Sequence, residues 1–122
     1  MKLALIAYLH GSGGAERQIV LLANEMSARG HETHLVVLCE NKSPYKIESS
    51  VIVHDLSSLE DTGKFRILKR FNLFKNEMKG IRPDITINYN LQGAYFSLLA
   101  GRKVCGKILY SERGDPYDSE YS

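Results

Sequence analysis

The first third of the chain decides the fold, and residues 3–40 read LALIAYLHGSGGAERQIVLLANEMSARGHETHLVVLCE. The run at 3–8 is almost entirely apolar, which is typical of a parallel strand buried on both faces. After a glycine loop at 11–14, apolar residues recur at helical spacing, and Gly30 stands where a helix would end in the left-handed conformation. A second apolar run at 34–38 follows, so these residues predict a right-handed β-α-β unit.

The remainder of the chain continues this alternation of strands and helices. The expected elements are a strand at 51–56, a helix at 63–80, a strand at 85–89, a helix at 91–101 and a strand at 107–110. Such an order predicts an α/β fold, a Rossmann-like open parallel sheet with helices on both faces, in one domain over residues 1–122. Because no helix follows the last expected strand, we expect this domain to be truncated at its C-terminal end.

Composition and charge narrow the class of protein. The 122 residues are 43% hydrophobic and 25% charged with a net charge of +2, which indicates a folded domain and no dedicated nucleic-acid binder. Cys39 and Cys105 are too few and too far apart for a disulfide scaffold or a cysteine zinc site, and we interpret both as small buried apolar residues. The apolar run at 3–9 is too short to span a membrane. We therefore expect a cytoplasmic protein.

Ligands of parallel α/β sheets bind at the carboxyl ends of the strands, and the first strand end carries the strongest signal. Gly13 and Gly14 remove side chains where a helix begins, which leaves its free N–H groups open to an anion such as a diphosphate. The alternative is a tight turn that binds nothing, with Glu16 capping the helix from its third position. The loop by itself supports both interpretations.

Two other functions remain open from the residues alone. Gly11 and Gly13 begin the G-x-G-x-x-G pattern of dinucleotide-binding domains, but Glu16 stands at the third glycine position. Glu40, at the end of the second strand, could hold a ribose, so an NAD-binding oxidoreductase domain stays an alternative. A non-catalytic α/β module that binds a carbohydrate or a partner is the other alternative.

Five segments, in their order and spacing, resemble family 4 glycosyltransferases of the GT-B fold. They are GGAER at 13–17, LANE at 22–25, ARGHE at 28–32, RPDI at 82–85 and SERGDPY at 111–117. The last segment is similar to the S-E-R-x-D-P segment of a bacterial branch that makes surface polysaccharides.

The resemblance implies a retaining transfer of a sugar from a nucleotide-sugar donor, a UDP-sugar, to a polysaccharide or lipid-linked acceptor. It implies no metal and no further cofactor. In that family, two Rossmann-like domains face each other, and this chain corresponds to the N-terminal, acceptor-side domain without its donor-binding partner domain. We therefore expect the chain alone to transfer no sugar.

The resemblance also implies roles for particular residues. Gly13 and Gly14 would approach the donor diphosphate, where N–H groups stabilise charge on a leaving group. Glu112 and Arg113 follow the last strand, in a turn where many family members carry a histidine that contacts the transferred sugar. We assign them to catalysis, with a structural ion pair as the alternative. The expected acceptor side consists of His10, Glu16, Arg17 and Asn90.

The expected helix at 63–80 is basic on its exposed side. Six lysines and arginines lie between 64 and 79 against a single acid, Glu77. Helical spacing predicts a buried stripe formed by Ile67, Phe71, Phe74, Met78 and Ile81.

Basic residues mixed with exposed apolar ones are typical of a helix that contacts anionic lipid. Phe65 and Leu73 fall outside the buried stripe, on the basic side. The alternative is an ordinary solvated face, with Phe65 packed against the start of the helix. Both interpretations stay open, and a peripheral contact with the inner face of the cell membrane would use Phe65, Arg66, Lys69, Leu73 and Lys75.

The four histidines show no converging ligand pattern, so we predict no metal site. His31 and His34 flank the start of a strand, at the edge of the sheet away from the expected site. Only His10, beside the glycine loop, is a candidate functional histidine.

Overall fold

The computed structural model describes residues 1–9, 14–41, 46–56, 66–89 and 91–110, with the backbone alone at 8, 9, 14–16, 39–41, 66, 67 and 91. The strands are β1 (Lys2–Leu9), β2 (Glu32–Asn41), β3 (Ile52–Asp55), β4 (Ile85–Asn88) and β5 (Lys107–Tyr110). The helices are α1 (Gly14–Ala28), α2 (Arg66–Ile81), α3 (Leu91–Ala100) and α4 (Arg102–Cys105).

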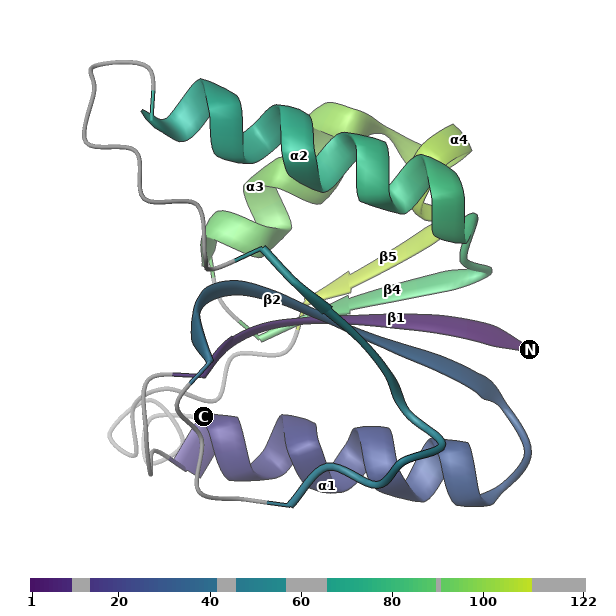
Figure 1. Ribbon diagram of the computed structural model, residues 1–122. Coiled ribbons are helices and arrows are strands. Elements are labelled where there is room, and N and C mark those ends of the chain that lie inside the picture. The colour runs from purple at the N-terminus through teal and green to yellow at the C-terminus, as the bar shows by residue number, and fades with distance from the viewer. Residues whose placement is uncertain (10–13, 42–45, 57–65, 90, 111–122) are drawn as a thin grey trace, which may run out of the picture.

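The strands form one parallel sheet in the order β3-β2-β1-β4-β5, with β1 at its centre. Figure 1 shows α1 on one face of this sheet and α2, α3 and α4 on the other. The chain winds outward from β1 first toward β3 and then toward β5, which is the arrangement of a Rossmann-like sheet. The predicted fold class is therefore confirmed.

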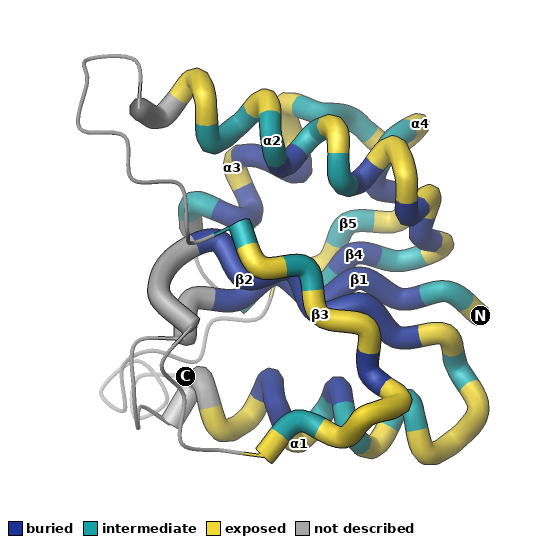
Figure 2. Tube along the Cα trace, in the orientation of Figure 1, coloured by how far each residue is buried: buried dark blue, intermediate teal, exposed yellow. Residues whose placement is uncertain are grey.

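The alternation of side chains along β1 divides the core into two layers. Leu3, Leu5 and Ala7 pack on the α1 side, whereas Ala4 and Ile6 pack on the α2 side. All five are buried, and Figure 2 shows the central strand dark along this stretch. An unbroken apolar run is thus what a strand covered on both faces requires.

The buried stripe predicted for the basic helix lies in α2. Phe74, Met78 and Ile81 are buried against the sheet, and Phe71 is half-buried beside them. Phe71 and Phe74 both pack against the Phe96 ring of α3, with ring centroids 5.4 and 5.7 Å away. This packing holds α2 and α3 together over the sheet.

Helix α1 ends as the sequence predicts. Gly30 has a φ of 91°, in the left-handed region. The N–H of Gly30 donates to the carbonyl of Ser27, and the N–H of His31 donates to the carbonyl of Met26. These two bonds form a Schellman motif, which satisfies carbonyls that would otherwise lack partners at the helix end.

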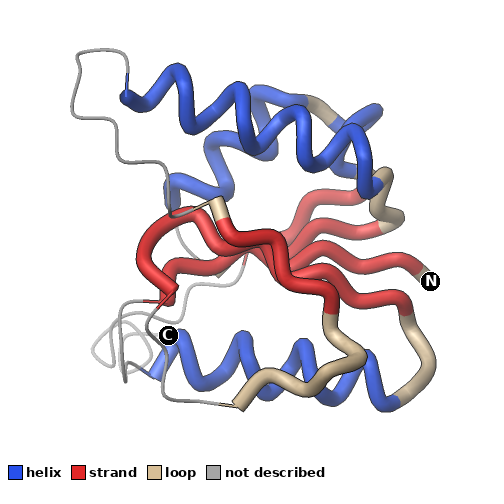
Figure 3. Tube along the Cα trace, in the orientation of Figure 1, coloured by secondary structure: helices blue, strands red, loops and turns tan. Residues whose placement is uncertain are grey.

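Two features differ from the expectations. The short helix α4 was not predicted, because four residues between Gly101 and Gly106 carry no periodic signal. The strand β3 lies at the edge of the sheet, as Figure 3 shows, and its Ile52 and Val53 are exposed. Apolar residues in a short run therefore predicted the strand but not its exposure.

Candidate functional site

The candidate site lies along the carboxyl edge of the sheet. Because all five strands are parallel, β1, β4 and β5 end along the same edge, at Leu9, Asn88 and Tyr110. The register places Asn88 beside Ile6 on one side and beside Tyr110 on the other. The strand ends that the sequence predicted to carry the site are therefore neighbours in space.

Most of the predicted site residues lie outside the described residues. They are His10, Gly13, Asn90, Glu112 and Arg113, and each follows the carboxyl end of β1, β4 or β5 along the chain. Their roles remain predictions.

The start of α1 is described, and it bears on the glycine loop. The helix begins at Gly14, five residues after β1 ends at Leu9. Glu16 lies in the first turn by its backbone position, and the side chain of Arg17 is exposed. The described backbone therefore has a strand followed by a helix that begins at Gly14, which is the order that an anion site at a helix N-terminus requires.

A buried polar cluster lies next to the candidate site, and no pattern in the sequence predicted it. Asn88, which the sequence places among the strand-end residues, is fully buried. Its Nδ2 donates to the carbonyl oxygen of Leu109 at 3.2 Å, and its Oδ1 accepts from the Ser97 hydroxyl at 3.2 Å. Asn88 thereby ties the ends of β4 and β5 to α3, and it positions the segments that lead to Asn90 and Glu112.

A second part of this cluster surrounds Cys105. The Thr86 hydroxyl donates to the carbonyl oxygen of Cys105 at 2.6 Å. Burial raises the pKa of the Cys105 thiol, and hydrogen bonds with Ser97 and Thr86 oppose part of that effect. Cys105 is free and fully buried, which confirms its prediction as a small apolar core residue.

The predicted membrane-contact residues are only partly described. Phe65 and the side chain of Arg66 lie outside the described residues, Lys69 is exposed, and Leu73 and Lys75 are half-buried. Lys69 and Leu73 line one shallow pocket of about 230 Å³ together with Asn72 and Asn76. No described helix is long and apolar enough to cross a membrane.

Two residues of α2 outside the predicted membrane contact add to the description of its basic side. Arg70 turns toward α3, where its guanidinium donates to Oε1 of Gln92 at 3.1 Å. Leu68, which the sequence analysis did not assign, is 57% exposed beside Lys69. The exposed face of α2 thus contains a large apolar residue next to a lysine.

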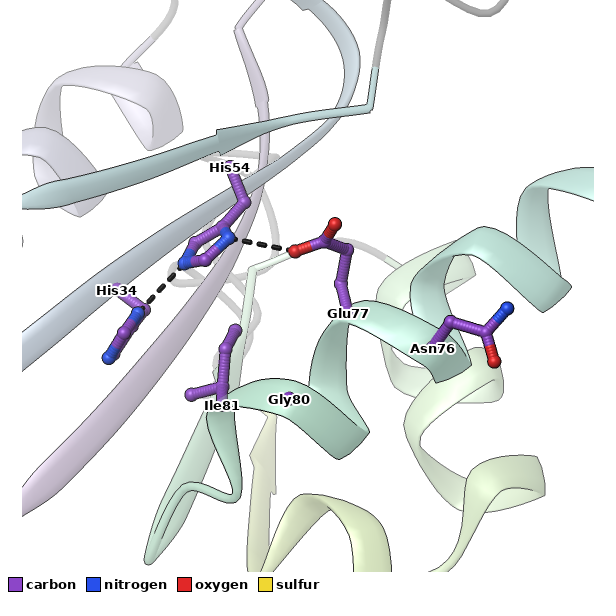
Figure 4. Close-up of a pocket in the computed structure, with 6 residues that line it drawn as sticks. All are labelled: His34, His54, Asn76, Glu77, Gly80 and Ile81. Carbon is purple, nitrogen blue, oxygen red and sulfur yellow. Dashed lines mark hydrogen bonds and ion pairs between the residues drawn. The ribbon is translucent and has the colours of Figure 1, made fainter.

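Two of the four histidines meet in the structure, a contact that the sequence analysis did not predict. His34 in β2 and His54 in β3 point toward each other, with 2.8 Å between His34 Nδ1 and His54 Nε2 (Figure 4). Glu32 Oε2 lies 2.7 Å from the other nitrogen of His34, and Glu77 Oε2 lies 2.9 Å from the other nitrogen of His54. We call these four side chains, Glu32, His34, His54 and Glu77, the histidine row. A pocket of about 280 Å³ opens beside it.

The histidine row could be found only once the strand register was known. His34 pairs with Ile52 and Val36 pairs with His54, which puts both rings on the α2 face of neighbouring strands. The hydrogen bond to His34 lowers the pKa of Glu32, desolvation opposes that effect, and Lys2 adds to the lowering. Among the described residues, no group of three or more His, Cys, Asp or Glu residues could hold a metal ion.

The fold and the candidate site define a Rossmann-like α/β protein with its ligand edge at the carboxyl ends of the strands. The chain is similar to a Campylobacter jejuni enzyme named GalNAc-alpha-(1->4)-GalNAc-alpha-(1->3)-diNAcBac-PP-undecaprenol alpha-1,4-N-acetyl-D-galactosaminyltransferase, with 33% identity over 93 residues. The match covers 73% of this chain and 26% of that glycosyltransferase, so this chain spans about a quarter of its curated relative.

Two further comparisons add no information on function. The chain matches no protein-family model. Among solved structures, it is similar to the pilus retraction motor PilT with bound ADP, with a TM-score of 0.44 and 15% identity over 98% of this chain and 33% of that one. A likeness at this level carries no argument about either protein's activity.

Proposed function

We propose that this chain is the acceptor-side part of a retaining, family 4 glycosyltransferase of the GT-B fold. The enzyme would transfer a sugar from a nucleotide-sugar donor to a polysaccharide or lipid-linked acceptor. The observation that carries the proposal is the 33% identity with the Campylobacter jejuni galactosaminyltransferase. The name of that relative includes PP-undecaprenol, and we extend this chemistry to a diphosphate-linked lipid acceptor for this chain.

The carboxyl edge of the sheet supports this proposal because β1, β4 and β5, which precede most of the predicted site residues along the chain, all end there. The loop that joins β1 to α1 would bring N–H groups of Gly13 and Gly14 to the donor diphosphate. Glu112 and Arg113, which follow β5, would contact sugar hydroxyls or phosphate. His10, Glu16, Arg17 and Asn90 would border the acceptor. The donor would be a UDP-sugar, and the reaction would need no metal or further cofactor.

The complete protein would have a second domain that binds most of the donor. The match to only 26% of the relative supports this part of the proposal. We therefore expect the 122-residue chain alone to show no transfer from UDP-sugars, and we expect transfer from the complete protein.

Replacing Gly14 by alanine in the complete protein is expected to lower kcat/KM for sugar transfer by about 100-fold. The added methyl group would separate the N–H groups at the start of α1 from the donor diphosphate, and one lost donor to developing charge typically has an effect of this size. The assay measures transfer of labelled sugar from UDP-sugars to undecaprenyl-diphosphate-linked glycans.

Gly80 provides a matched control, because it also lies in a helix and a Cβ there meets no atom within 4 Å. Gly80→Ala should retain full transfer activity. Equal activity of Gly14→Ala and Gly80→Ala would contradict the role of the loop. Titration of the protein with NADH and with UDP-sugars tests the NAD-binding oxidoreductase alternative. Stoichiometric binding of NADH together with no binding of UDP-sugars would overturn the proposed function.

We also propose that α2 contacts the anionic inner face of the membrane. Lys69 and Leu68 are both exposed, and Leu73 lines the same pocket as Lys69. Exposed apolar and basic side chains on one helix combine burial in the headgroup region with attraction to anionic lipid. This contact would bring the carboxyl edge of the sheet close to a lipid-linked acceptor.

Reversing charge at Lys69 and Lys75 together is expected to abolish flotation of the chain with anionic liposomes. Each basic residue near an anionic surface contributes about 1 kcal/mol to attachment, so reversal of two should lower binding by more than tenfold. The single change Lys69→Glu is measured as well, with Lys46→Glu as its matched control. Lys46 is exposed near α1, on the opposite face of the sheet (Figure 1). Equal flotation of the wild type and of the variant with both charges reversed would contradict this proposal.

A further inference from the structure

Three short contacts join four side chains on the α2 face of the sheet. Glu32 Oε2 lies 2.7 Å from His34 Nε2, and His34 Nδ1 lies 2.8 Å from His54 Nε2. His54 Nδ1 in turn lies 2.9 Å from Glu77 Oε2. All three are hydrogen-bond distances, and Figure 4 shows the two rings and Glu77 turned toward one another.

Counting hydrogens decides how this row can be protonated. Each contact needs one hydrogen, because two lone pairs that face each other at such distances repel. Two neutral imidazoles carry one N–H each, and two ionised carboxylates carry none. The row therefore needs a third hydrogen, and an imidazole is ordinarily a stronger base than a carboxylate.

We propose that His34 and His54 bind one added proton between them, and that this proton-binding pair holds β3 and α2 against β2. With the proton bound, the two rings share one N–H···N hydrogen bond, and the outer N–H of each ring donates to a carboxylate. A second added proton does not fit, because it would place two N–H groups face to face across 2.8 Å.

The charged groups around the pair favour one added positive charge. Glu32 faces it from β2 and Glu77 from α2, while β1 contributes Lys2, whose Nζ lies 3.7 Å from Glu32. The other residues that line the pocket, Asn76, Gly80 and Ile81, carry no charge. Two carboxylates thus stand against one ammonium group, and a nearby opposite charge favours the protonated form of an imidazole.

Loss of the proton would act first on β3. This strand has four residues, lies at the edge of the sheet and exposes Ile52 and Val53. Without the proton, one of the three contacts lacks its hydrogen, and the link from β2 through β3 to α2 is broken. With the proton bound, the folded chain holds one more proton than the unfolded chain above the ordinary titration range of histidine, so stability must fall as pH rises there and the proton is lost.

The test compares the pH dependence of unfolding in three forms of the chain. Urea unfolding is measured from about pH 6 to about pH 9 for the wild type, His54→Gln and His31→Gln. Glutamine supplies its own N–H and does not titrate, so His54→Gln keeps a hydrogen bond without needing the proton. His31, which lies outside the row, is the matched control.

We expect the unfolding equilibrium constant of the wild type to rise by up to about tenfold per pH unit relative to His54→Gln, since one proton is linked to folding. His31→Gln should retain the wild-type dependence. Equal pH dependence in the wild type and His54→Gln would overturn the proposal.

A measurement on the unmodified chain keeps the test independent of variant folding. Ring ¹⁵N NMR should show one positive charge shared by His34 and His54 at a pH above the ordinary titration range of histidine. Two neutral rings at that pH would also overturn the proposal.

Discussion

Replacing Gly106 by alanine is expected to lower the free energy of unfolding by about 3 kcal/mol. Gly106 has a φ of 67°, and a Cβ there would lie 2.4 Å from the carbonyl oxygen of Asp84 and 2.5 Å from that of Pro83. These are backbone atoms, so the added methyl group can be accommodated only by moving the chain. With a ψ of −146°, Gly106 lies close to a backbone region that is essentially restricted to glycine, and this conformation alone costs alanine about 1–3 kcal/mol.

The position of Gly106 explains why this movement would be costly. The N–H of Lys107, the first residue of β5, donates to the carbonyl of Asp84 at 3.0 Å. Asp84 also receives the N–H of Lys2 on its side chain at 2.8 Å, which ties the start of β1 to the same turn. A shift at Gly106 would therefore disturb the beginnings of β1, β4 and β5 together.

Urea unfolding of Gly106→Ala measures this effect, with Gly80→Ala as the control. Gly80 lies inside α2 with open space around it, so alanine there should stabilise the chain by about 0.5–1 kcal/mol. Equal stability of Gly106→Ala and the wild type would show that the close approach of Gly106 to Asp84 does not persist in solution.

Replacing Phe74 by alanine is expected to lower the free energy of unfolding by about 3–5 kcal/mol. Phe74 is fully buried, belongs to the core on the α2 side with Ala4 and Ile6, and lies 5.7 Å from the Phe96 ring. Truncation would leave a cavity where α2, α3 and the sheet meet. A lower denaturation midpoint with an unchanged denaturant slope would report this loss.

Leu98→Ala is the matched control for the change at Phe74. Leu98 lies on α3 with 65% of its surface exposed, so its truncation should change stability by less than about 0.5 kcal/mol. A loss at Phe74 no larger than the loss at Leu98 would contradict the position of α2 over the sheet.

The parallel sheet and its connecting helices follow from local patterns. The run at 3–8 reads as a strand covered on both faces, and the helical spacing of Ile19 and Ala23 reads as the buried side of α1. Gly30 marks the end of α1 because few other residues adopt a φ of 91° without strain. These signals lie within a few residues of each other, so a single sequence contains them.

The candidate site was predictable only in its location. Strands that alternate with helices place the ligand edge at the carboxyl ends, and β1, β4 and β5 do end together there. The roles of Gly13, Glu112 and Arg113 stay predictions. Asn88 was not assigned from the sequence, and its side chain is buried with hydrogen bonds to Leu109 and Ser97.

By itself, the sequence determined the elements of this protein, their α/β order and the edge of the sheet where a ligand would bind. Only the tertiary structure decided that His34, His54 and Glu77 meet. His34 and His54 are 20 residues apart along the chain, and Glu77 lies a further 23 residues on, so their contact depends on strand register and on where α2 packs. Periodicity reports which face of an element is buried, whereas register depends on how separate elements pair.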